Sequence, residues 1–432
     1  MRAQSLKLSF AFNLAGMAVP IAVALVTIPL YLQTMGESRY GVLAIAWLLL
    51  GYAGFLDLGL SRATANALAR LAEAPLIERG RLIVSALYLN SLLGIAGGGV
   101  IAVLGGMVFQ WWFDLPPDLA AEAAAALPWL GAMLPMALLS GIAIGALESK
   151  ERFLAANVLQ VTGSTLGQVV PVIIAMHVGP GLDLVIPAAF AMRLVSLVLI
   201  LGVLAHSERI RPYRFDPKVG RSLFQYGAWV SVTGVVGPIL TSVDQVIIGA
   251  KLGTAAVAHY AVPMNLTVKA QGVAAALART MFPRFSRYDS AAAIDLAERS
   301  TVTLAYGFGA ICGSAMILAG PFLEVWINPE FAAQATPVAH ILILGAWING
   351  LAFLALFLVQ GQGRPDLAAR IHLAELLPFL ALLWLLVQAY GLEGAAVAWT
   401  LRVGIDALVF FWVSGQRSRR MLRLLPAAGL LL

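Results

Sequence analysis

The sequence has few charged residues and almost no cysteine. Of its 432 residues only 12% are Asp, Glu, Lys or Arg, whereas a soluble domain has about 25%. This scarcity excludes a soluble enzyme and a disordered chain. It also leaves few charges with which a formal net charge of +6 could bind a nucleic acid. The single cysteine, Cys312, excludes a disulfide framework and a cysteine-based metal centre.

Apolar residues make up 60% of the chain and fall in long runs. A membrane-spanning helix needs about 20 such residues, so the composition suits about twelve helices joined by short loops. The first run lacks a small-x-small cleavage pattern, which favours a retained helix over a signal peptide. The sequence therefore predicts an all-α polytopic membrane protein, with spans at 8–33, 40–60, 82–109, 121–147, 153–176, 184–205, 222–250, 254–278, 300–323, 337–360, 367–389 and 394–414.

The basic residues predict the orientation of these spans. With both termini in the cytoplasm, Arg39 and Lys251 are the only ones of the 28 lysines and arginines in outer loops. Three more, Arg193, Lys269 and Arg402, fall within spans, and all the others lie on the cytoplasmic side. This bias agrees with the positive-inside rule. A wrong helix count would place every later loop on the opposite side and destroy the bias, so the bias supports both the orientation and the count of twelve.

The two halves of the chain align with each other. A shift of 214 residues places Trp112 on Trp326, and a shift of 209 places Arg193 on Arg402. Six helices separate the copies, and an even number preserves orientation, so the sequence predicts two parallel six-helix repeats. We expect an N-terminal half at 1–210, a linker at 211–220, a C-terminal half at 221–416 and an interfacial tail at 417–432. Such repeats are typical of transporters that bind substrate near the midplane.

Several short motifs occur near the ends of the predicted spans: Pro29–Leu32, Gly36, Tyr40–Val42, Gly51, Asp57–Leu60, Leu252–Gly253, Tyr260–Val262 and Gly391–Ala396. These motifs resemble those of the bacterial polysaccharide and O-antigen (Wzx-type) flippases of the multidrug/oligosaccharidyl-lipid/polysaccharide (MOP) superfamily. Their order and position extend the resemblance over essentially the whole chain.

The resemblance implies a transporter of the bacterial cytoplasmic membrane that flips an undecaprenyl-diphosphate-linked oligosaccharide to the outer leaflet by alternating access. It also implies a cationic central cavity and no cofactor. H⁺ or Na⁺ as coupling ion and polysaccharide assembly proteins as partners are further expectations. A multidrug or small-molecule exporter of the same superfamily is the alternative. A membrane enzyme is disfavoured, because the longest outer loop is short and acidic.

Cations within spans are candidate ligands for phosphate, because intramembrane charges usually face a cavity. Arg193 and Arg402 lie about nine residues, or roughly 13 Å, from the outer ends of their helices. Arg402 has possible partners in Asp406 and Glu375, so a structural ion pair and a substrate contact both stay open. Arg193 has Leu197 and Thr162 at the matching places, and Lys269 lacks a carboxylate within one turn. Arg62 completes the candidate phosphate ligands.

Four acidic residues are candidates for gating or ion coupling: Asp57, Asp244, Glu375 and Asp406. Asp57 lies five residues before Arg62, so it either braces the helix end or gates the cytoplasmic side. Asp244 lies about 10 Å below the outer surface, where a coupling carboxylate could sit.

Glycine and proline residues occupy corresponding places in the first helix of each half and are hinge candidates, although both are common in membrane helices. They are Gly16, Pro20, Gly234, Gly237 and Pro238.

Overall fold

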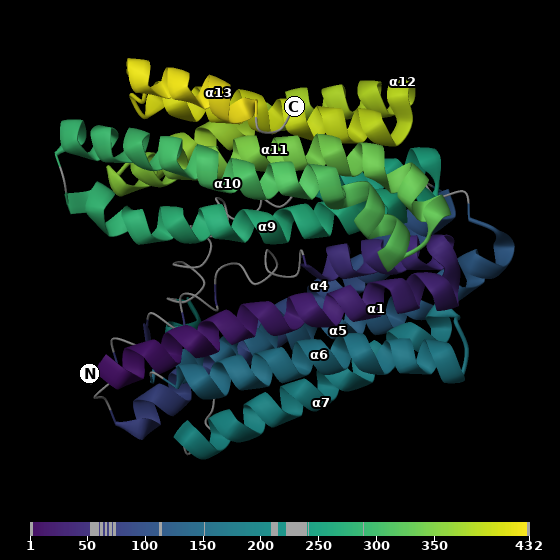
Figure 1. The fold of residues 1–432 in the computed structure, drawn as a ribbon. Coiled ribbons are helices and arrows are strands. Elements are labelled where there is room, and N and C mark those ends of the chain that lie inside the picture. The colour runs from purple at the N-terminus through teal and green to yellow at the C-terminus, as the bar shows by residue number, and fades with distance from the viewer. Residues whose placement is uncertain are drawn as a thin grey trace. The chain divides into compact units, whose positions relative to one another are not determined.

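The structure is a computed structural model, and Figure 1 shows its ribbon. It describes the chain except residues 1–2, 52–59, 61–63, 65–66, 69–70, 72–74, 112–114, 151, 209–214, 222–239, 241, 288 and 430–432. Throughout the described residues the regular structure is helical, in agreement with the predicted all-α class. The elements are α1 (Ala3–Gly51), α4 (Leu76–Trp111), α5 (Pro117–Glu148), α6 (Phe153–His177), α7 (Leu182–Glu208), α9 (Thr254–Arg287), α10 (Ser290–Trp326), α11 (Pro329–Gly361), α12 (Pro365–Val413), η1 (Arg419–Arg423) and α13 (Leu424–Ala428).

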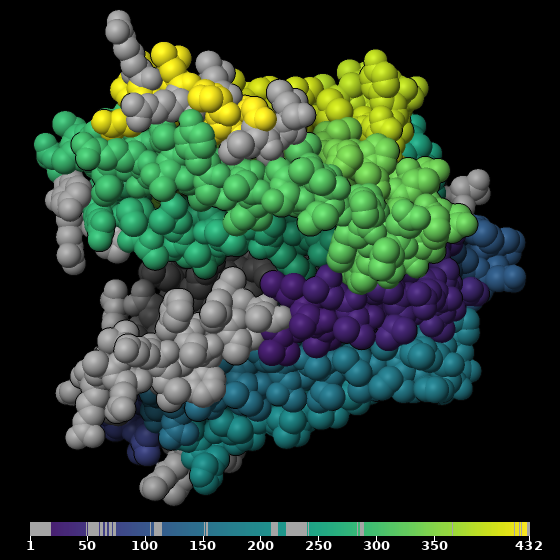
Figure 2. Space-filling model, in the orientation of Figure 1, coloured from purple at the N-terminus to yellow at the C-terminus, as the bar shows by residue number. Residues whose placement is uncertain are grey.

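The chain divides into two compact units, Met1–Pro238 and Ile239–Leu432. In the N-terminal unit α5 packs against α4 and α7, while α6 packs against α7 and α1. Figure 2 shows the side chains of α1 directly against those of α6. In the C-terminal unit α11 packs against α9, α10 and α12. The predicted repeat, its boundaries and its parallel orientation stay predictions.

Two glycines each lie between two predicted spans, at a kink inside one long helical element. Gly36 interrupts α1 with φ 79° and ψ 166°, and Gly391 interrupts α12 with φ 59° and ψ −133°. Such backbone angles are strongly unfavourable for a residue with a Cβ. A Cβ at Gly36 would meet no atom within 4 Å, so the backbone angles alone require glycine there. α12 therefore holds both predicted spans 367–389 and 394–414 as two limbs on either side of Gly391.

Several helices begin earlier than the predicted spans. α10 starts at Ser290, where the side chain of Asp289 accepts a hydrogen bond from the Ala292 N–H at 3.3 Å. α11 starts at Pro329, after Asn328 accepts from the Phe331 N–H at 2.7 Å. Hydropathy finds only the apolar part of a helix, whereas capping groups decide where the helix begins.

Eight of the described helices are long and apolar enough to cross a membrane. α9, which contains the predicted span 254–278, is not among the eight. Its sequence places Asn265, Lys269 and Gln271 where a lipid-facing helix would be apolar. Extensive packing against α11 covers one face of this helix. The count of twelve spans and the cytoplasmic position of the termini stay predictions.

The hinge candidates divide between described and undescribed residues. The backbone of Gly16 and Pro20 lies in α1, whose departure from helical angles is at Gly36. Gly234, Gly237 and Pro238 lie outside the described residues. Bending at these positions stays a prediction.

Candidate functional site

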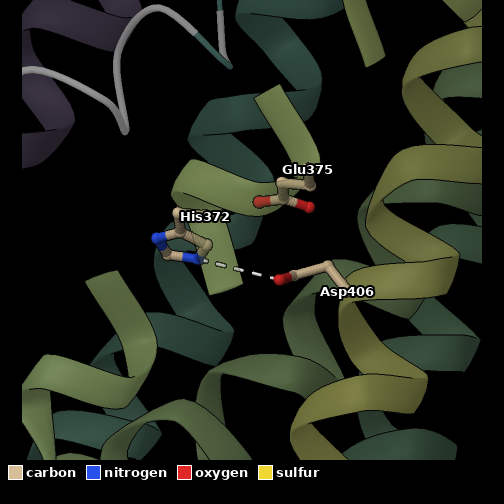
Figure 3. A group of neighbouring side chains, drawn as sticks. All are labelled: His372, Glu375 and Asp406. Carbon is tan, nitrogen blue, oxygen red and sulfur yellow. Dashed lines mark ion pairs between the residues drawn. The ribbon is translucent and has the colours of Figure 1, made fainter. Parts of the chain in front are cut away.

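A cluster of ionisable side chains lies inside the C-terminal unit, between the two limbs of α12. His372 and Glu375 are three residues apart on the first limb, so one helix face carries both. Arg402 and Asp406 are four residues apart on the second limb. The reversal at Gly391 brings the two limbs together, and Figure 3 shows three of these side chains converging from them.

The side chains of this cluster lie close together, but some of their buried polar atoms have no hydrogen-bond partner among the described residues. Arg402 Nη1 lies 3.5 Å from Glu375 Oε1, and His372 Nε2 lies 3.7 Å from Asp406 Oδ1. The side chains of Arg402, Asp406 and Glu375 are 9%, 8% and 12% exposed. Within the described residues, Arg402 Nε and Asp406 Oδ1 are buried without a hydrogen-bond partner. The predicted ion pair of Arg402 is therefore present with Glu375, and it leaves polar atoms unsatisfied.

Aromatic rings border the cluster on two sides. The guanidinium carbon of Arg402 lies 5.5 Å from the ring centroid of Phe379, a cation–π distance. The imidazole of His372 meets the ring of Phe410 edge-on at 5.6 Å. The coordinating atoms of His372, Glu375 and Asp406 lie within 4.8 Å of one another, so these three residues could hold a small cation.

Asp244 is fully buried, and both of its carboxylate oxygens accept hydrogen bonds. Tyr260 donates its hydroxyl to Asp244 Oδ2 at 2.5 Å, and the Gln245 N–H donates to Asp244 Oδ1 at 2.8 Å. Both carboxylate oxygens are thus occupied by donors from its own helix and from α9. This geometry favours a structural role for Asp244, which ties the segment 242–252 to α9.

Arg193 and Lys269 differ from Arg402 in having no charged partner among the described residues. Arg193 lies on the face of α7 that carries the buried Ala189 and Leu197, and it is itself partly buried. Across the residues that the structure describes, neither Arg193 nor Lys269 takes part in a hydrogen bond or ion pair. Contact of either residue with an anionic substrate stays a prediction. Asp57 and Arg62 lie outside the described residues.

Sequence reasoning missed a buried ionic network at one end of the N-terminal unit. Arg79 of α4 donates to Glu208 at the end of α7, from Nε at 3.1 Å and from Nη2 at 2.8 Å. Arg79 also donates to the backbone oxygens of Leu68 and Leu71 at 2.9 and 3.0 Å. Lys150 Nζ lies 2.9 Å from Glu208 as well. No local pattern marks this network, because Arg79 and Glu208 are 129 residues apart.

The C-terminal unit also ties a helix to a later segment of the chain, here with the acidic side chains on the earlier helix. Glu298 of α10 accepts hydrogen bonds from the backbone N–H and the hydroxyl of Ser418, which follows α12. Asp295, also on α10, pairs with Arg420 of η1 at 2.6 Å. The acid therefore lies on the earlier helix here, whereas it lies on the later one in the N-terminal unit.

The long apolar helices indicate a multi-pass membrane protein, and its fold is similar to that of MOP-superfamily transporters. Its structure is similar to that of the lipid II flippase MurJ in an inward closed conformation, with a TM-score of 0.80, 14% identity, and coverage of 97% of this chain and 90% of that chain. It is also similar to an inward-facing multidrug resistance MATE family transporter of the MOP superfamily, with a TM-score of 0.73, 16% identity, and coverage of 96% and 99%.

The sequence identifies the family. Residues 9–289 match the family described as polysaccharide biosynthesis protein, and the chain belongs to that family. It is 26% identical over 406 residues to a Shigella flexneri protein named provisionally as an O-antigen transporter, covering 93% of this chain and 96% of that protein. The predicted resemblance to the Wzx-type polysaccharide transporters is confirmed.

Proposed function

We propose that this protein flips an undecaprenyl-diphosphate-linked oligosaccharide from the cytoplasmic to the outer leaflet of the bacterial inner membrane by alternating access. Membership of the polysaccharide biosynthesis family, over residues 9–289, carries this proposal. The provisional name of the Shigella flexneri relative supports an O-antigen or exopolysaccharide repeat unit as cargo. Proteins that assemble the polysaccharide are its expected partners.

Arg193 is the side chain proposed to bind the diphosphate. An arginine presents a planar fork of donors that matches phosphate oxygens in pairs. Arg193 is partly buried, and its described contacts include no carboxylate. Its positive charge is therefore unfavourable until an anion binds to it. Lys269 is proposed as a second contact, and Arg62 as a third. Arg402 already contacts Glu375, so its contribution to phosphate binding would be weaker.

A pump for cationic drugs is the competing function, because the MATE transporter shares this fold. A cavity for cationic drugs is expected to present acidic side chains. The cations Arg193 and Lys269, which have no charged partner among the described residues, favour an anionic cargo instead.

Deletion of the gene in its own host tests this function. Undecaprenyl-diphosphate oligosaccharides are then quantified by mass spectrometry, with complementation by wild type, Arg193→Ala and Arg370→Ala. Arg370 is exposed and pairs with Asp366 on one helix, so its variant is the matched control. We expect one complete repeat unit to accumulate, with rescue by wild type and Arg370→Ala only. Rescue by Arg193→Ala would refute the site assignment. The absence of accumulation, together with normal surface polysaccharide, would refute the flippase.

A further inference from the structure

The segment that follows α12 is strongly basic. Residues 417–423 contain four arginines and no acidic residue. The arginines are Arg417, Arg419, Arg420 and Arg423. α12 is long and apolar enough to cross a membrane, and it ends at Val413. A cluster of basic residues immediately beyond a membrane-spanning helix is typical of segments that attract anionic lipid headgroups.

Hydrogen bonds fix this segment to α10. The Ser418 N–H donates to Glu298 Oε1 at 2.9 Å, and the Ser418 hydroxyl donates to the other oxygen of the same carboxylate. Arg420 Nη1 lies 2.6 Å from Asp295 Oδ1. Asp295 and Glu298 are three residues apart, so one face of α10 provides both contacts. The segment therefore has a fixed place beside this helix.

The apolar side chains that follow the arginines complete a core of the C-terminal unit. Ala427 of α13 is 0% exposed and lies in one hydrophobic cluster with Ala293 and Ala297 of α10. Leu424 packs against the same cluster. We refer to residues 418–428 as the C-terminal strap. Its position is set by this packing as well as by hydrogen bonds.

The C-terminal strap lies beside the polar beginning of α10. Residues 290–299 include Asp295, Glu298 and Arg299, whereas residues 300–323 include no Asp, Glu, Lys or Arg. The hydrocarbon core of a bilayer accommodates the apolar part of such a helix. The polar beginning of α10, and the strap packed against it, therefore lie at the level of the lipid headgroups.

The acidic side chains that contact the strap leave it with a net positive charge. Asp295 pairs with Arg299 at 2.8 Å as well as with Arg420. Both oxygens of Glu298 already accept hydrogen bonds from Ser418. Two carboxylates thus serve Arg299 and the four arginines of residues 417–423. An anionic ligand would offset the remaining positive charge.

Exposed side chains at this end of α12 suit a bilayer surface. Leu422 is 63% exposed and Trp412 is 62% exposed. The exposed Arg417 lies over the Trp412 ring at 5.0 Å, and its Nη2 donates to the Trp412 backbone oxygen at 2.7 Å. Tryptophan, arginine and leucine together are typical of the boundary between headgroups and acyl chains, where charge and apolar contact both contribute.

We propose that the C-terminal strap, together with Arg417, is a binding site for anionic phospholipids. Its arginines bind the lipid phosphate, because a guanidinium presents a planar fork of donors that matches phosphate oxygens. Leu422 contacts the acyl chains. A zwitterionic lipid offers the same phosphate with an ammonium group that offsets it, so the site prefers lipids with a net negative charge. This binding does not depend on the transport function proposed above.

Titration of the purified full-length protein, in a neutral detergent, with phosphatidylglycerol or phosphatidylethanolamine tests the site. Native mass spectrometry counts the bound lipids and gives the dissociation constant for each. We expect the wild type to bind phosphatidylglycerol more tightly than phosphatidylethanolamine. Each basic residue near a membrane surface contributes about fivefold to the attraction of anionic lipid. The combined variant Arg417→Gln, Arg419→Gln and Arg423→Gln is therefore expected to weaken phosphatidylglycerol binding by about tenfold or more.

A second combined variant controls for the change in net charge. It removes three exposed arginines of α9 and α12, as Arg279→Gln, Arg284→Gln and Arg370→Gln, and is expected to keep the wild-type affinity. An equal loss of phosphatidylglycerol binding in the two combined variants would overturn the proposal. Equal affinity of the wild type for the two lipids would overturn the choice of a lipid as occupant, in favour of a soluble anionic partner.

Glu298→Ala separates a positioned site from general electrostatic attraction. This change removes the acceptor of both Ser418 hydrogen bonds, and it also removes a negative charge. We expect weaker phosphatidylglycerol binding, because the strap loses its attachment to α10. Tighter binding by the folded variant would overturn the proposal. Gel filtration and thermal unfolding check the folding of each variant, and the two combined variants test the site if Glu298→Ala does not fold.

Discussion

Removing the charge of Glu208 tests whether the buried network of the N-terminal unit stabilises the fold. The side chains of Arg79 and Glu208 are 1% and 0% exposed, and two hydrogen bonds join them. Glu208→Gln leaves the cations of Arg79 and Lys150 facing a neutral amide. Breaking a buried pair from one side costs about 3–5 kcal/mol, because an unpaired buried charge is left behind. We expect the free energy of unfolding to fall by about that amount.

Unfolding of the purified protein in mixed micelles, as the fraction of denaturing detergent rises, measures this change. Asp366→Asn provides a control at an exposed ion pair, in which Arg370 is 77% and Asp366 62% exposed, and such pairs contribute about 0–1 kcal/mol. Replacing both members, as in Arg79→Met with Glu208→Leu, removes the unpaired charge and recovers part of the loss. A loss for Glu208→Gln no larger than that of the control would refute the reasoning.

Two further changes test the fold, the first in the same assay and the second by thiol labelling. Gly36→Ala places a Cβ on a residue with φ 79° and ψ 166°, and it is expected to destabilise the protein by about 1–3 kcal/mol. The control is Gly99→Ala, at a helical position with open space, which is expected to be neutral or stabilising. Equal effects of the two variants would contradict the backbone argument. Tyr260→Phe removes the donor to Asp244 and is expected to cost about 1–3 kcal/mol. Thiol labelling of the buried Cys312, in the same unit, reports that unfolding, and a wild-type labelling profile would show that Asp244 does not depend on Tyr260.

The two arginines that the predicted repeat places at matched positions differ in their contacts. Arg402 contacts Glu375 from the other limb of α12, whereas Arg193 has no charged partner among the described residues. The sequence predicts this difference, because Leu197 and Thr162 occupy the places that match Asp406 and Glu375. Substrate binding by one arginine and ion coupling by the surroundings of the other would follow from that asymmetry. Phosphate binding by Arg193 stays a proposal, and ion coupling at Glu375 and Asp406 stays a prediction.

His372 shows where sequence reasoning stopped short. Its spacing from Glu375 places both on one helix face, and Arg402 and Asp406 share a face in the same way. The sequence does not show that these two faces meet. The antiparallel return of α12 at Gly391 brings the two faces together, so that His372 Nε2 lies 3.7 Å from Asp406 Oδ1.

The sequence by itself determined the helices and their membrane character. A long apolar run is a local property of the chain, and its length and hydropathy are enough to favour its insertion into a bilayer. It also determined the breaks between predicted spans in which Gly36 and Gly391 lie, and the cations within predicted spans. Only the tertiary structure decided which of those charges are paired. Arg79 is buried because Glu208, 129 residues away, returns to the same end of its unit. Such pairing depends on distances between helices, which local hydropathy and spacing do not contain.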